Sequence, residues 1–365
     1  MTKLMTADSE PEIFPSDRCD DVTVQRGNAS PLPWFSHDQF PLYLAPMAGV
    51  SDKIFRQLCK ERGANVLVTE FVSAEGVFRR NERTRRYLDF DEIERPLGVQ
   101  LFGGNAEHMA EAARQVIEWV QPDFIDLNFG CPVNKVVAKN GGSALLKDCL
   151  LLGKVADAVV RAVAPIPVTA KIRIGWDEQS INAVQVGRQL ESLGISALAT
   201  HGRTRAQGYS GFADWEIIAE VAAAVSIPVI GNGDLFSAAD VAKRKSESGI
   251  AGAMIGRAAM NSPWIFSQTK HYLATGELLP PPEPAEKWAL IQRHCELAVD
   301  ECRSNGPCPA DAEDLAMRSM RGRLMAYSKG MSAGKLLRER FQHVSTIAEV
   351  EEIARLHLAT CLEAA

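Results

Sequence analysis

The sequence predicts a (β/α)8 TIM barrel followed by a small C-terminal helical domain. Two observations lead to this fold class. First, from residue 41 onward, eight short apolar runs alternate with helical stretches over about 230 residues, which suits eight β–α units closed into a barrel. Second, a proline-rich segment at residues 279–284 ends this alternation, and only helical periodicity follows it. We therefore expect a barrel over residues 41–279 and a helical domain over residues 285–365.

The predicted strands are rich in apolar and β-branched residues and lack strict alternation of polar and apolar side chains. This pattern is typical of parallel strands that are buried on both faces. In chain order, the strands are expected at residues 42–45, 65–69, 97–101, 124–128, 168–172, 197–200, 228–230 and 252–255. Helical patterns lie between them at residues 106–120, 148–163 and 183–192, and beyond the barrel at residues 287–303, 312–328 and 335–364.

Composition narrows the class of protein. The 365 residues contain no apolar stretch that approaches the ~20 needed to span a bilayer, so we expect no membrane partner. Residues 1–40 are polar and rich in Pro, Ser and Asp, which predicts a disordered extension and not a secretion signal. The net charge of −6 does not by itself favour nucleic-acid binding, so that role would need local basic patches.

The eight cysteines limit the chemistry further. No pair has Cys-x-x-Cys spacing, so we expect no metal site. Scattered cysteines in a long chain without a signal favour a reducing cytoplasm. For the oligomeric state we expect a monomer.

Active sites of barrels of this kind lie at the carboxyl ends of the strands. Most predicted strands of this chain end there in polar residues or glycine. The candidates are Pro46, Met47, Ala48, Glu70, Gln100, Asn128, Cys131, Lys171, Arg173, His201, Arg203, Asn232, Gly233, Asp234, Gly256 and Arg257. A barrel without function would have no reason to place lysine, histidine, arginine and asparagine at these positions.

Cys131 is the most informative of these candidates. The apolar run at residues 124–128 stops before Gly130 and Pro132, which prevent the strand from continuing. A thiol just beyond a strand end faces a cleft, where it can act as a nucleophile, a metal ligand or a proton donor. The plain alternative is a small buried residue, because free cysteine is among the most buried residue types. The polar surroundings favour a functional thiol.

The loops after the last two strands are typical of a phosphate site. They contain Asn232, Gly233 and Asp234 in one loop and Gly256 and Arg257 in the other. In barrels these two loops commonly bind phosphate through backbone N–H groups, and arginine can add a bidentate contact. Turn formation alone would explain each glycine taken singly. Two such loops at the right strands together favour a phosphate ligand.

Cationic residues are expected around the mouth of the barrel. Lys171 would end the fifth strand, where a buried lysine is costly without an anionic partner. The alternative is a lysine whose ammonium extends to the surface. His201 is placed to hold a phosphate or a ring atom, and the nearby Arg203 and Arg205 favour a functional role over a structural one.

Several motifs of this chain resemble those of the tRNA-dihydrouridine synthases, most closely the bacterial B-type branch. They lie at residues 45–52 (APMAGVSD), 128–132 (NFGCP), 142–146 (GSALL), 168–173 (VTAKIR), 201–206 (HGRTRA), 227–234 (IPVIGNGD), 254–259 (MIGRAA) and 263–266 (PWIF). They follow the family's order and spacing over residues 42–279. The resemblance is weaker in the C-terminal helices and absent in the first 40 residues.

The resemblance implies an FMN-binding catalytic barrel over residues 41–279 and a helical tRNA-binding domain over residues 285–365. It also implies that the enzyme reduces the C5–C6 double bond of specific uridines in the D-loop of tRNA, with NADPH or NADH as reductant. This reduction needs a hydride, which a flavin supplies and no side chain can. It also needs a proton, which a thiol with a pKa of about 8.5 can give at neutral pH. The uridine must be extruded from the folded tRNA into the barrel mouth.

The resemblance assigns roles residue by residue. Cys131 would be the proton donor. Pro46, Met47, Ala48, Gln100, Lys171 and His201 would contact the flavin or its side chain, and Asn232, Gly233, Asp234, Gly256 and Arg257 would hold its phosphate. Asn128, Arg203 and Arg205 would bind the substrate.

Binding of tRNA needs cations, and the basic residues are clustered in two places. Five arginines fall between residues 79 and 86, and seven arginines and lysines fall between residues 315 and 344. Solvated surface helices also carry such runs, so the clusters alone do not establish an RNA site. The segment at residues 317–324 departs from the family pattern, which leaves the mode of tRNA docking open.

Two other functions are compatible with part of the sequence. One is an FMN barrel oxidoreductase that acts on a free pyrimidine, like the dihydroorotate dehydrogenases, but such an enzyme would not need a basic helical domain. The other is a tRNA-binding protein that has lost catalysis. The presence of Cys131, Lys171 and both phosphate loops argues against the second alternative.

Overall fold

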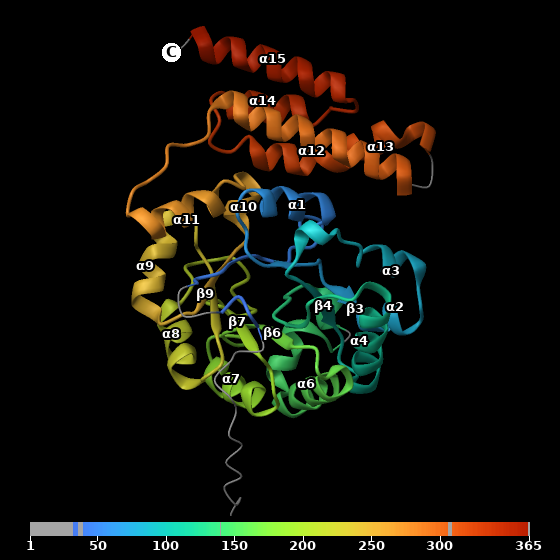
Figure 1. Cartoon of the computed structure of the whole chain (residues 1–365), viewed down its shortest axis with the longest axis vertical. Coiled ribbons are helices and arrows are strands. Elements are labelled where there is room, and N and C mark those ends of the chain that lie inside the picture. The colour runs from blue at the N-terminus through green and yellow to red at the C-terminus, as the bar shows by residue number, and fades with distance from the viewer. Residues whose placement is uncertain (1–31, 36–38, 139, 306–308, 364–365) are drawn as a thin grey trace, which may run out of the picture.

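The structure is a computed structural model that describes residues 32–35, 39–138, 140–305 and 309–363. Figure 1 shows a ring of helices around a core of parallel strands, with further helices beyond the ring. The strands are β1 (Leu42–Leu44), β2 (Leu67–Val68), β3 (Val72–Ser73), β4 (Leu97–Phe102), β5 (Phe124–Phe129), β6 (Val168–Arg173), β7 (Ala197–His201), β8 (Val229–Asn232) and β9 (Gly252–Ile255). The predicted (β/α)8 TIM barrel with C-terminal helices after it is confirmed.

The strands form one parallel sheet in the order β1-β9-β8-β7-β6-β5-β4-β2, and β3 pairs with β4. A bridge between Tyr43 and Val66 joins β1 to the residue before β2, so the sheet nearly closes on itself. Leu44 N–H donates to the Val66 carbonyl there at 3.1 Å. The predicted strand at residues 65–69 is too long. β2 pairs with β4 at only two residues, and the chain pairs with β4 again at β3.

The helices of the barrel cover the outside of the sheet. They are α1 (Lys53–Glu61), α2 (Ala74–Phe78), α3 (Glu82–Arg86), α4 (Ala106–Val120), α5 (Asn134–Val137), α6 (Cys149–Val163), α7 (Ala183–Ser192), α8 (Trp215–Ala224), α9 (Ala238–Ser248), α10 (Arg257–Asn261) and α11 (Ile265–Thr275). The predicted bounds of α4 and α7 are confirmed. α6 begins one residue later than predicted, because Asp148 is its N-cap and accepts a hydrogen bond from Leu151 N–H at 2.9 Å.

A short segment that begins at Leu32 covers the amino-terminal end of the barrel. Leu32 is fully buried, and Trp34 Nε1 donates to the Tyr43 hydroxyl at 2.6 Å. The Trp34 ring also lies 5.5 Å from that of Phe124, between centroids. Residues 1–31 of the predicted disordered extension lie outside the described residues. Leu32 and Trp34 therefore belong to the folded part of the chain, although the prediction placed them in the extension. Their apolar side chains fill the open end of the barrel.

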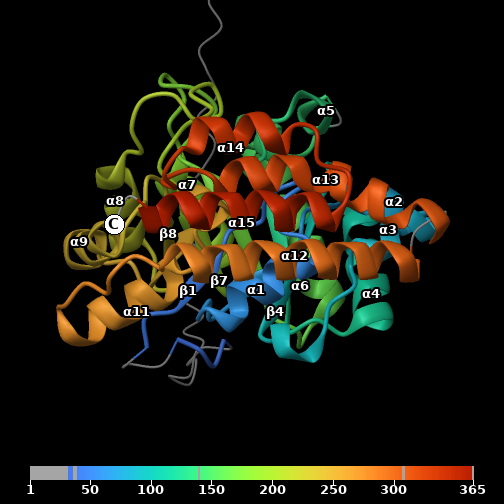
Figure 2. The ribbon, with the colours of Figure 1, turned by 90° about the horizontal axis from the view of Figure 1, so that it is seen from above.

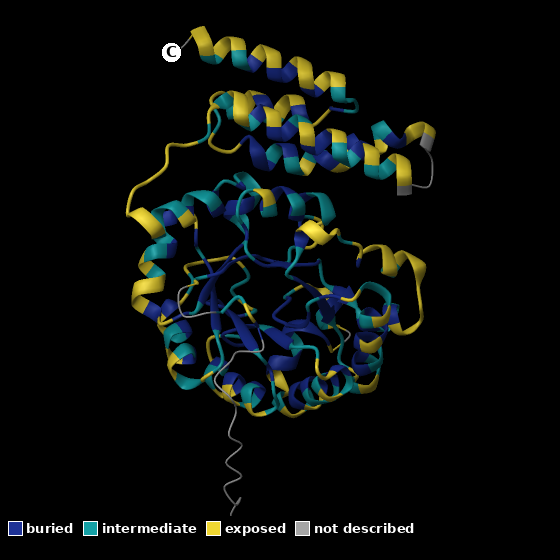
Figure 3. Cartoon of the chain, viewed as in Figure 1, coloured by how far each residue is buried: buried dark blue, intermediate teal, exposed yellow. Residues whose placement is uncertain are grey.

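Within the described residues, four helices follow the barrel: α12 (Pro284–Asn305), α13 (Ala312–Tyr327), α14 (Gly334–Phe341) and α15 (Ile347–Glu363). They pack on one another and lie over α1 and α10 of the ring (Figures 1 and 2). The chain reaches them through an exposed linker after α11, whereas the strands form the buried centre of the barrel (Figure 3). None of the described helices is long and apolar enough to cross a membrane.

Two details of these helices differ from the prediction. Pro284 begins α12 and does not end the linker, since proline in the first helical turn loses no hydrogen bond. The predicted helix at residues 335–364 is two helices. Before α15, the Ser345 and Thr346 N–H groups donate to the Glu349 carboxylate at 2.6 and 3.0 Å, which stops one helix and starts the next.

Candidate active site

A cavity of about 490 Å³ opens at the carboxyl ends of the barrel strands. Its lining contains thirteen of the fifteen residues to which the resemblance assigns a role: Pro46, Met47, Ala48, Gln100, Asn128, Cys131, Lys171, His201, Asn232, Gly233, Asp234, Gly256 and Arg257. Residues that are distant in the sequence meet here because all parallel strands of a barrel end on one side. The other two, Arg203 and Arg205, are not part of the lining. Of the two strand-end candidates without an assigned role, Arg173 lines the cavity and Glu70 does not.

Cys131 lies in the wall of this cavity and is 7% exposed. Asn128 Oδ1 accepts hydrogen bonds from the N–H groups of Gly130 and Cys131 at 3.1 and 2.9 Å, and these bonds turn the chain away from the direction of β5. Burial raises the pKa of the Cys131 thiol, against weaker lowering effects of Val133 N–H and Arg173. The thiol is therefore protonated at neutral pH.

A row of buried polar side chains lies beneath the cavity and joins β4, β5 and β6. Asn128 Nδ2 donates to Gln100 Oε1 at 2.7 Å, and Gln100 Nε2 donates to Asp126 Oδ2 at 2.6 Å. The Thr169 hydroxyl donates to Asp126 Oδ1 at 2.5 Å. Burial raises the pKa of Asp126, although these two bonds lower it. The sequence analysis did not select Asp126. A lone carboxylate within an apolar strand is the feature that could have indicated a buried polar contact here.

Lys171 lies in β6 with its ammonium group at the cavity. Its Nζ is 3.3 Å from Asn232 Oδ1, and Asn232 Nδ2 in turn donates to the Met254 carbonyl at 2.7 Å. Burial, with a smaller contribution from Arg173, lowers the pKa of Lys171 to about 8. In the described part of the chain this ammonium has one hydrogen-bond acceptor, so an anionic ligand would stabilise its charged form.

Arg173, two residues further along β6, joins the turn of Cys131 to the loop after β7. Its Nε donates to the Gly130 carbonyl at 3.0 Å. Its Nη1 donates to the carbonyls of Thr204 and Gly208, each at 2.9 Å. Arg173 was recognised at a strand end but given no role, since its acceptors are backbone carbonyls that no sequence motif reveals.

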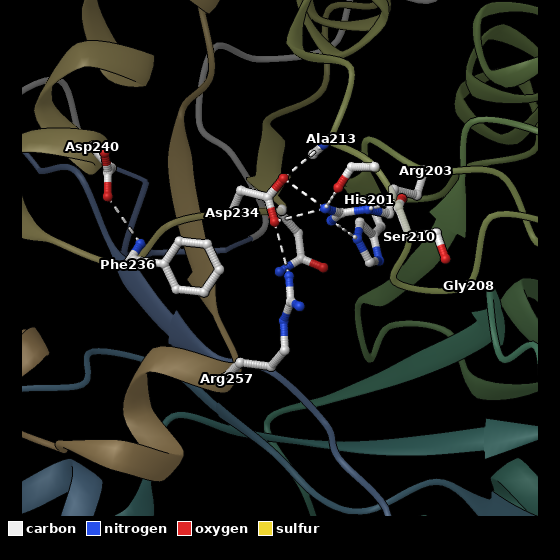
Figure 4. Close-up of polar contacts among 12 residues, drawn as sticks. His201, Arg203, Gly208, Ser210, Ala213, Asp234, Phe236, Asp240 and Arg257 are labelled. Carbon is white, nitrogen blue, oxygen red and sulfur yellow. Dashed lines mark hydrogen bonds and ion pairs between the residues drawn. The ribbon is translucent and has the colours of Figure 1, made fainter. Parts of the chain in front are cut away.

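Asp234 contacts two arginines beside the cavity (Figure 4). Arg203 Nη2 donates to both carboxylate oxygens at 2.8 and 2.7 Å, and Arg257 Nη2 donates to Oδ1 at 2.8 Å. Burial acts to raise the pKa of Asp234, but the bonds from Arg203 and Ala213 N–H outweigh it and the pKa is lowered. Arg203 itself is almost fully buried, which explains why it lies behind the lining.

His201 ends β7 and lies against Arg203, with His201 Nε2 3.5 Å from Arg203 Nη1 (Figure 4). Burial, followed by Lys171 and the nearby arginines, lowers the pKa of His201 well below its ordinary value, so the imidazole is neutral.

The turn that follows β8 requires glycine at residue 233. Gly233 has φ +131°, and a Cβ at this position would lie 2.5 Å from Ala213 Cβ.

Arg205 lies outside the cavity lining, whereas two aromatic side chains beyond the predicted residues belong to it. Arg205 Nη2 donates to Asn134 Oδ1 at 3.0 Å, and its guanidinium lies 4.6 Å from the centroid of the Trp176 ring. Tyr209 and Phe236 line the cavity and are largely exposed. Sequence reasoning missed both, because a loop sequence does not show which aromatic side chains turn toward a cavity.

The charges around the cavity favour an anionic ligand. Lys171, Arg173 and Arg257 line it, while the carboxylate of Asp234 is already paired with arginine. Among the residues described, no group of three or more His, Cys, Asp or Glu side chains is arranged to hold a metal ion. The fold and the site together define a (β/α)8-barrel enzyme. Its ligand cavity is lined by cationic side chains and has a protonated thiol in its wall.

Comparisons with known proteins identify the family. The profile of the dihydrouridine synthase (Dus) family matches residues 43–364. A Pseudomonas aeruginosa protein named tRNA-dihydrouridine synthase B is 46% identical over 257 residues, which cover 70% of this chain and 77% of that protein. A Xanthomonas campestris protein of the same name is 46% identical over 253 residues, covering 69% and 76%. The chain therefore belongs to the dihydrouridine synthase family, as its motifs predicted. It is an oxidoreductase that acts on a CH–CH bond, and the family implies a flavin cofactor.

Proposed function

We propose that this protein is a flavin-dependent tRNA-dihydrouridine synthase, with FMN as its cofactor and NADPH or NADH as its reductant. It reduces the C5–C6 double bond of specific uridines in the D-loop of tRNA. The observation that carries this proposal is the thiol of Cys131, which lies in the wall of a cationic cavity and has a raised pKa. The family supplies the reaction class, and the thiol supplies the proton that the reaction needs.

The volume and the donors of the cavity support FMN as the proposed cofactor. Its volume of about 490 Å³ lies within the range of roughly 300–1,000 Å³ that is usual for ligand pockets. Lys171 offers an ammonium with spare hydrogen-bonding capacity, and Gly233 and Gly256 leave the backbone accessible. The proposed phosphate site consists of Asn232, Gly233, Asp234, Gly256 and Arg257. The proposed ring contacts are Pro46, Met47, Ala48, Gln100, Lys171 and His201.

The residues of the chain perform the proton transfer and the positioning. When bound, the flavin supplies the hydride that adds to C6 of the uracil. Cys131 Sγ–H gives its proton to C5, and the thiolate recovers a proton from solvent. The charges of Arg173 and Lys171 lower the pKa of this thiol. They would therefore stabilise the thiolate until it recovers its proton. Asn128 holds the turn of Cys131 and is also a proposed contact of the uracil.

Arg203 and Arg205 have different proposed tasks toward the substrate. The guanidinium of Arg203 donates to the carbonyls of Ser210 and Gly211 and to Asp234, so it acts on the uracil by ordering the loop after β7. Arg205 lies outside the lining beside Trp176, and its proposed task is to contact the phosphate backbone of the nucleotide that enters the cavity.

The proposed partner is tRNA, bound through the basic clusters and the helices after the barrel. The arginines between residues 79 and 86 are exposed on and beside α3, where phosphate groups can reach them. The proposed location is the cytoplasm, which is supported by this partner and by the free cysteines of the described residues, of which Cys131 is one. The proposed oligomeric state is a monomer.

The test is to incubate unmodified tRNA with the purified protein, FMN and NADPH and to map dihydrouridine by position. Dihydrouridine at one or a few D-loop positions is the expected result, and it would also identify the uridine that is modified. Flavin binding and NADPH oxidation without dihydrouridine would contradict the proposal and favour a free pyrimidine as substrate.

A further inference from the structure

The loop between β1 and α1 forms one wall of the cavity. Its residues Pro46, Met47, Ala48 and Val50 belong to the lining. Within the loop, Met47 N–H donates to Ser51 Oγ at 2.8 Å, and Val50 N–H donates to the Met47 carbonyl at 2.9 Å. The shape of this wall therefore depends on how the tip of the loop is held.

The barrel itself holds this loop from the inside. The buried Arg56 donates from Nη1 to the Ser51 carbonyl at 3.1 Å and from Nε to Glu94 Oε2 at 2.6 Å. At the tip, Gly49 has φ +69°. These contacts leave the carbonyl groups of the tip to be satisfied from elsewhere.

Arg323 of α13 supplies the donors for these carbonyls. Its Nη1 donates to the Val50 carbonyl, and its Nη2 donates to the Gly49 carbonyl at 3.3 Å and to Asp52 Oδ2 at 2.5 Å. The guanidinium also lies 5.2 Å from the centroid of the Phe55 ring, and its side chain is 11% exposed. One side chain from the C-terminal helices thus contacts the loop at its tip and at its junction with α1.

We infer that Arg323 is a positioning residue for the cofactor site, through which the C-terminal helices set the shape of the wall formed by residues 46–50. The inference rests on the flavin site of the proposed function. A second contact supports it, because α13 also packs against α10, whose Ala258 and Met260 line the same cavity. The C-terminal helices therefore contact two segments of the cavity lining.

The simpler alternative is that Arg323 only docks the helices on the barrel. The structure contains a matched contact that does only this. Arg293 of α12 makes a bidentate ion pair with Glu61 of α1, with both N–O distances 2.6 Å. This pair joins the same two parts of the chain, but neither residue lines the cavity or contacts the loop at residues 46–50.

The experiment compares Arg323→Ala with Arg293→Ala in the full-length protein, stripped of cofactor and titrated with FMN. Flavin fluorescence gives the Kd, and the visible absorption band of the bound flavin reports its surroundings. We expect Arg323→Ala to raise the Kd for FMN about tenfold and to shift the band, since a charged donor to two carbonyls is lost. Arg293→Ala is expected to leave the Kd within about twofold and the band unchanged.

A milder variant keeps the inference testable if Arg323→Ala does not fold. Asp52 Oδ1 accepts a hydrogen bond from Phe55 N–H at 2.9 Å as the N-cap of α1, and asparagine caps helices as well as aspartate does. Asp52→Asn should therefore keep α1 but weaken the contact with Arg323, with a smaller rise in the Kd for FMN.

Equal Kd values for wild type, Arg323→Ala and Asp52→Asn would overturn the inference, as would equal rises for the Arg323 and Arg293 variants. Failure of the wild type to bind FMN would overturn both this inference and the proposed function. FMN binding that depends on Arg323, in a protein that forms no dihydrouridine, would contradict only the proposed substrate.

Discussion

The environment of Cys131 limits which of three chemical roles its thiol can take. A nucleophile or a metal ligand needs a thiolate, and therefore a lowered pKa or a set of partner ligands. Burial instead raises the pKa of Cys131, and no metal-binding group of side chains is present among the described residues. Both observations support the proposed role of Cys131 as a proton donor.

Replacing Cys131 tests this role directly. Cys131→Ala should lower the rate of dihydrouridine formation by about 10²–10⁴-fold, the usual contribution of general acid catalysis, and should leave the Kd for FMN and for tRNA unchanged. The measurement is single-turnover reduction of tRNA uridine. Cys149→Ala is the matched control, because Cys149 begins α6 and does not line the cavity. Equal rates for Cys131→Ala and wild type would refute the proton-donor role.

Lys171 gives a prediction for pH. In the free protein its pKa is lowered to about 8, so the ammonium is charged below that pH and loses its charge above it. An anionic ligand favours the charged form, so the affinity for FMN should fall as pH rises above about 8, by up to about tenfold per pH unit. Lys171→Ala should bind FMN more weakly at pH 7 and lack this pH dependence. A parallel pH dependence in both proteins would exclude Lys171 as its source.

At the scale of elements, the segments that follow β7, β8 and β9 form one unit around Asp234. Arg203 comes from the loop after β7 and Arg257 from the start of α10, and both donate to this carboxylate (Figure 4). Ala213 N–H adds a third contact at 2.7 Å. The proposed phosphate loops therefore hold their shape through ion pairs, and these pairs neutralise a carboxylate that would otherwise repel an anion.

The turn at Gly233 leaves no room for a larger residue. Gly233→Ala would place a methyl group 2.5 Å from Ala213 Cβ at a φ of +131°, so the loop must shift. We expect a lower melting temperature and a Kd for FMN raised by tenfold or more, on the order of a lost charged hydrogen bond. Gly249→Ala is the control, with a positive φ of 64° but no heavy atom within 4 Å of the added Cβ. It should cost only about 1 kcal/mol of stability and leave FMN binding unchanged.

At the scale of the whole molecule, a net charge of −6 must be reconciled with a polyanionic substrate. The exposed arginines of α3 offer a local basic surface on the barrel. The helices α12–α15 lie beyond the ring on the side of α1 and α10 (Figure 1). We expect the basic surface on α3 to bind phosphate groups and to position the tRNA, while the cavity selects the base.

Salt dependence tests this surface. Arg83→Ala should weaken tRNA binding and reduce the slope of log K against log salt concentration by about 1, as expected for one lost phosphate contact. The control is Arg161→Ala on α6, because Arg161 is 76% exposed and paired with Asp157. An unchanged slope for Arg83→Ala would remove this residue from the RNA surface. Filter binding at several salt concentrations provides the measurement.

Much of the fold could be predicted from the sequence, because parallel strands buried on both faces leave dense apolar runs. The strands β4 to β9 lie within about two residues of their predicted bounds for this reason. β3 was missed because it has only two residues, and the segment at Leu32 was missed because its burial depends on the open end of the barrel. Asp126 and Arg173 escaped notice because their partners lie on other strands.

By itself, the sequence determined the alternation of strands and helices, the residues at the strand ends and the motifs that identify the family. These features are local, so they can be read along the chain. The tertiary structure alone decided the directions of the pKa shifts of Cys131 and Lys171, because burial and nearby charges come from separate strands. It also decided the contact of Arg323 with Val50, 273 residues apart, which no local pattern encodes.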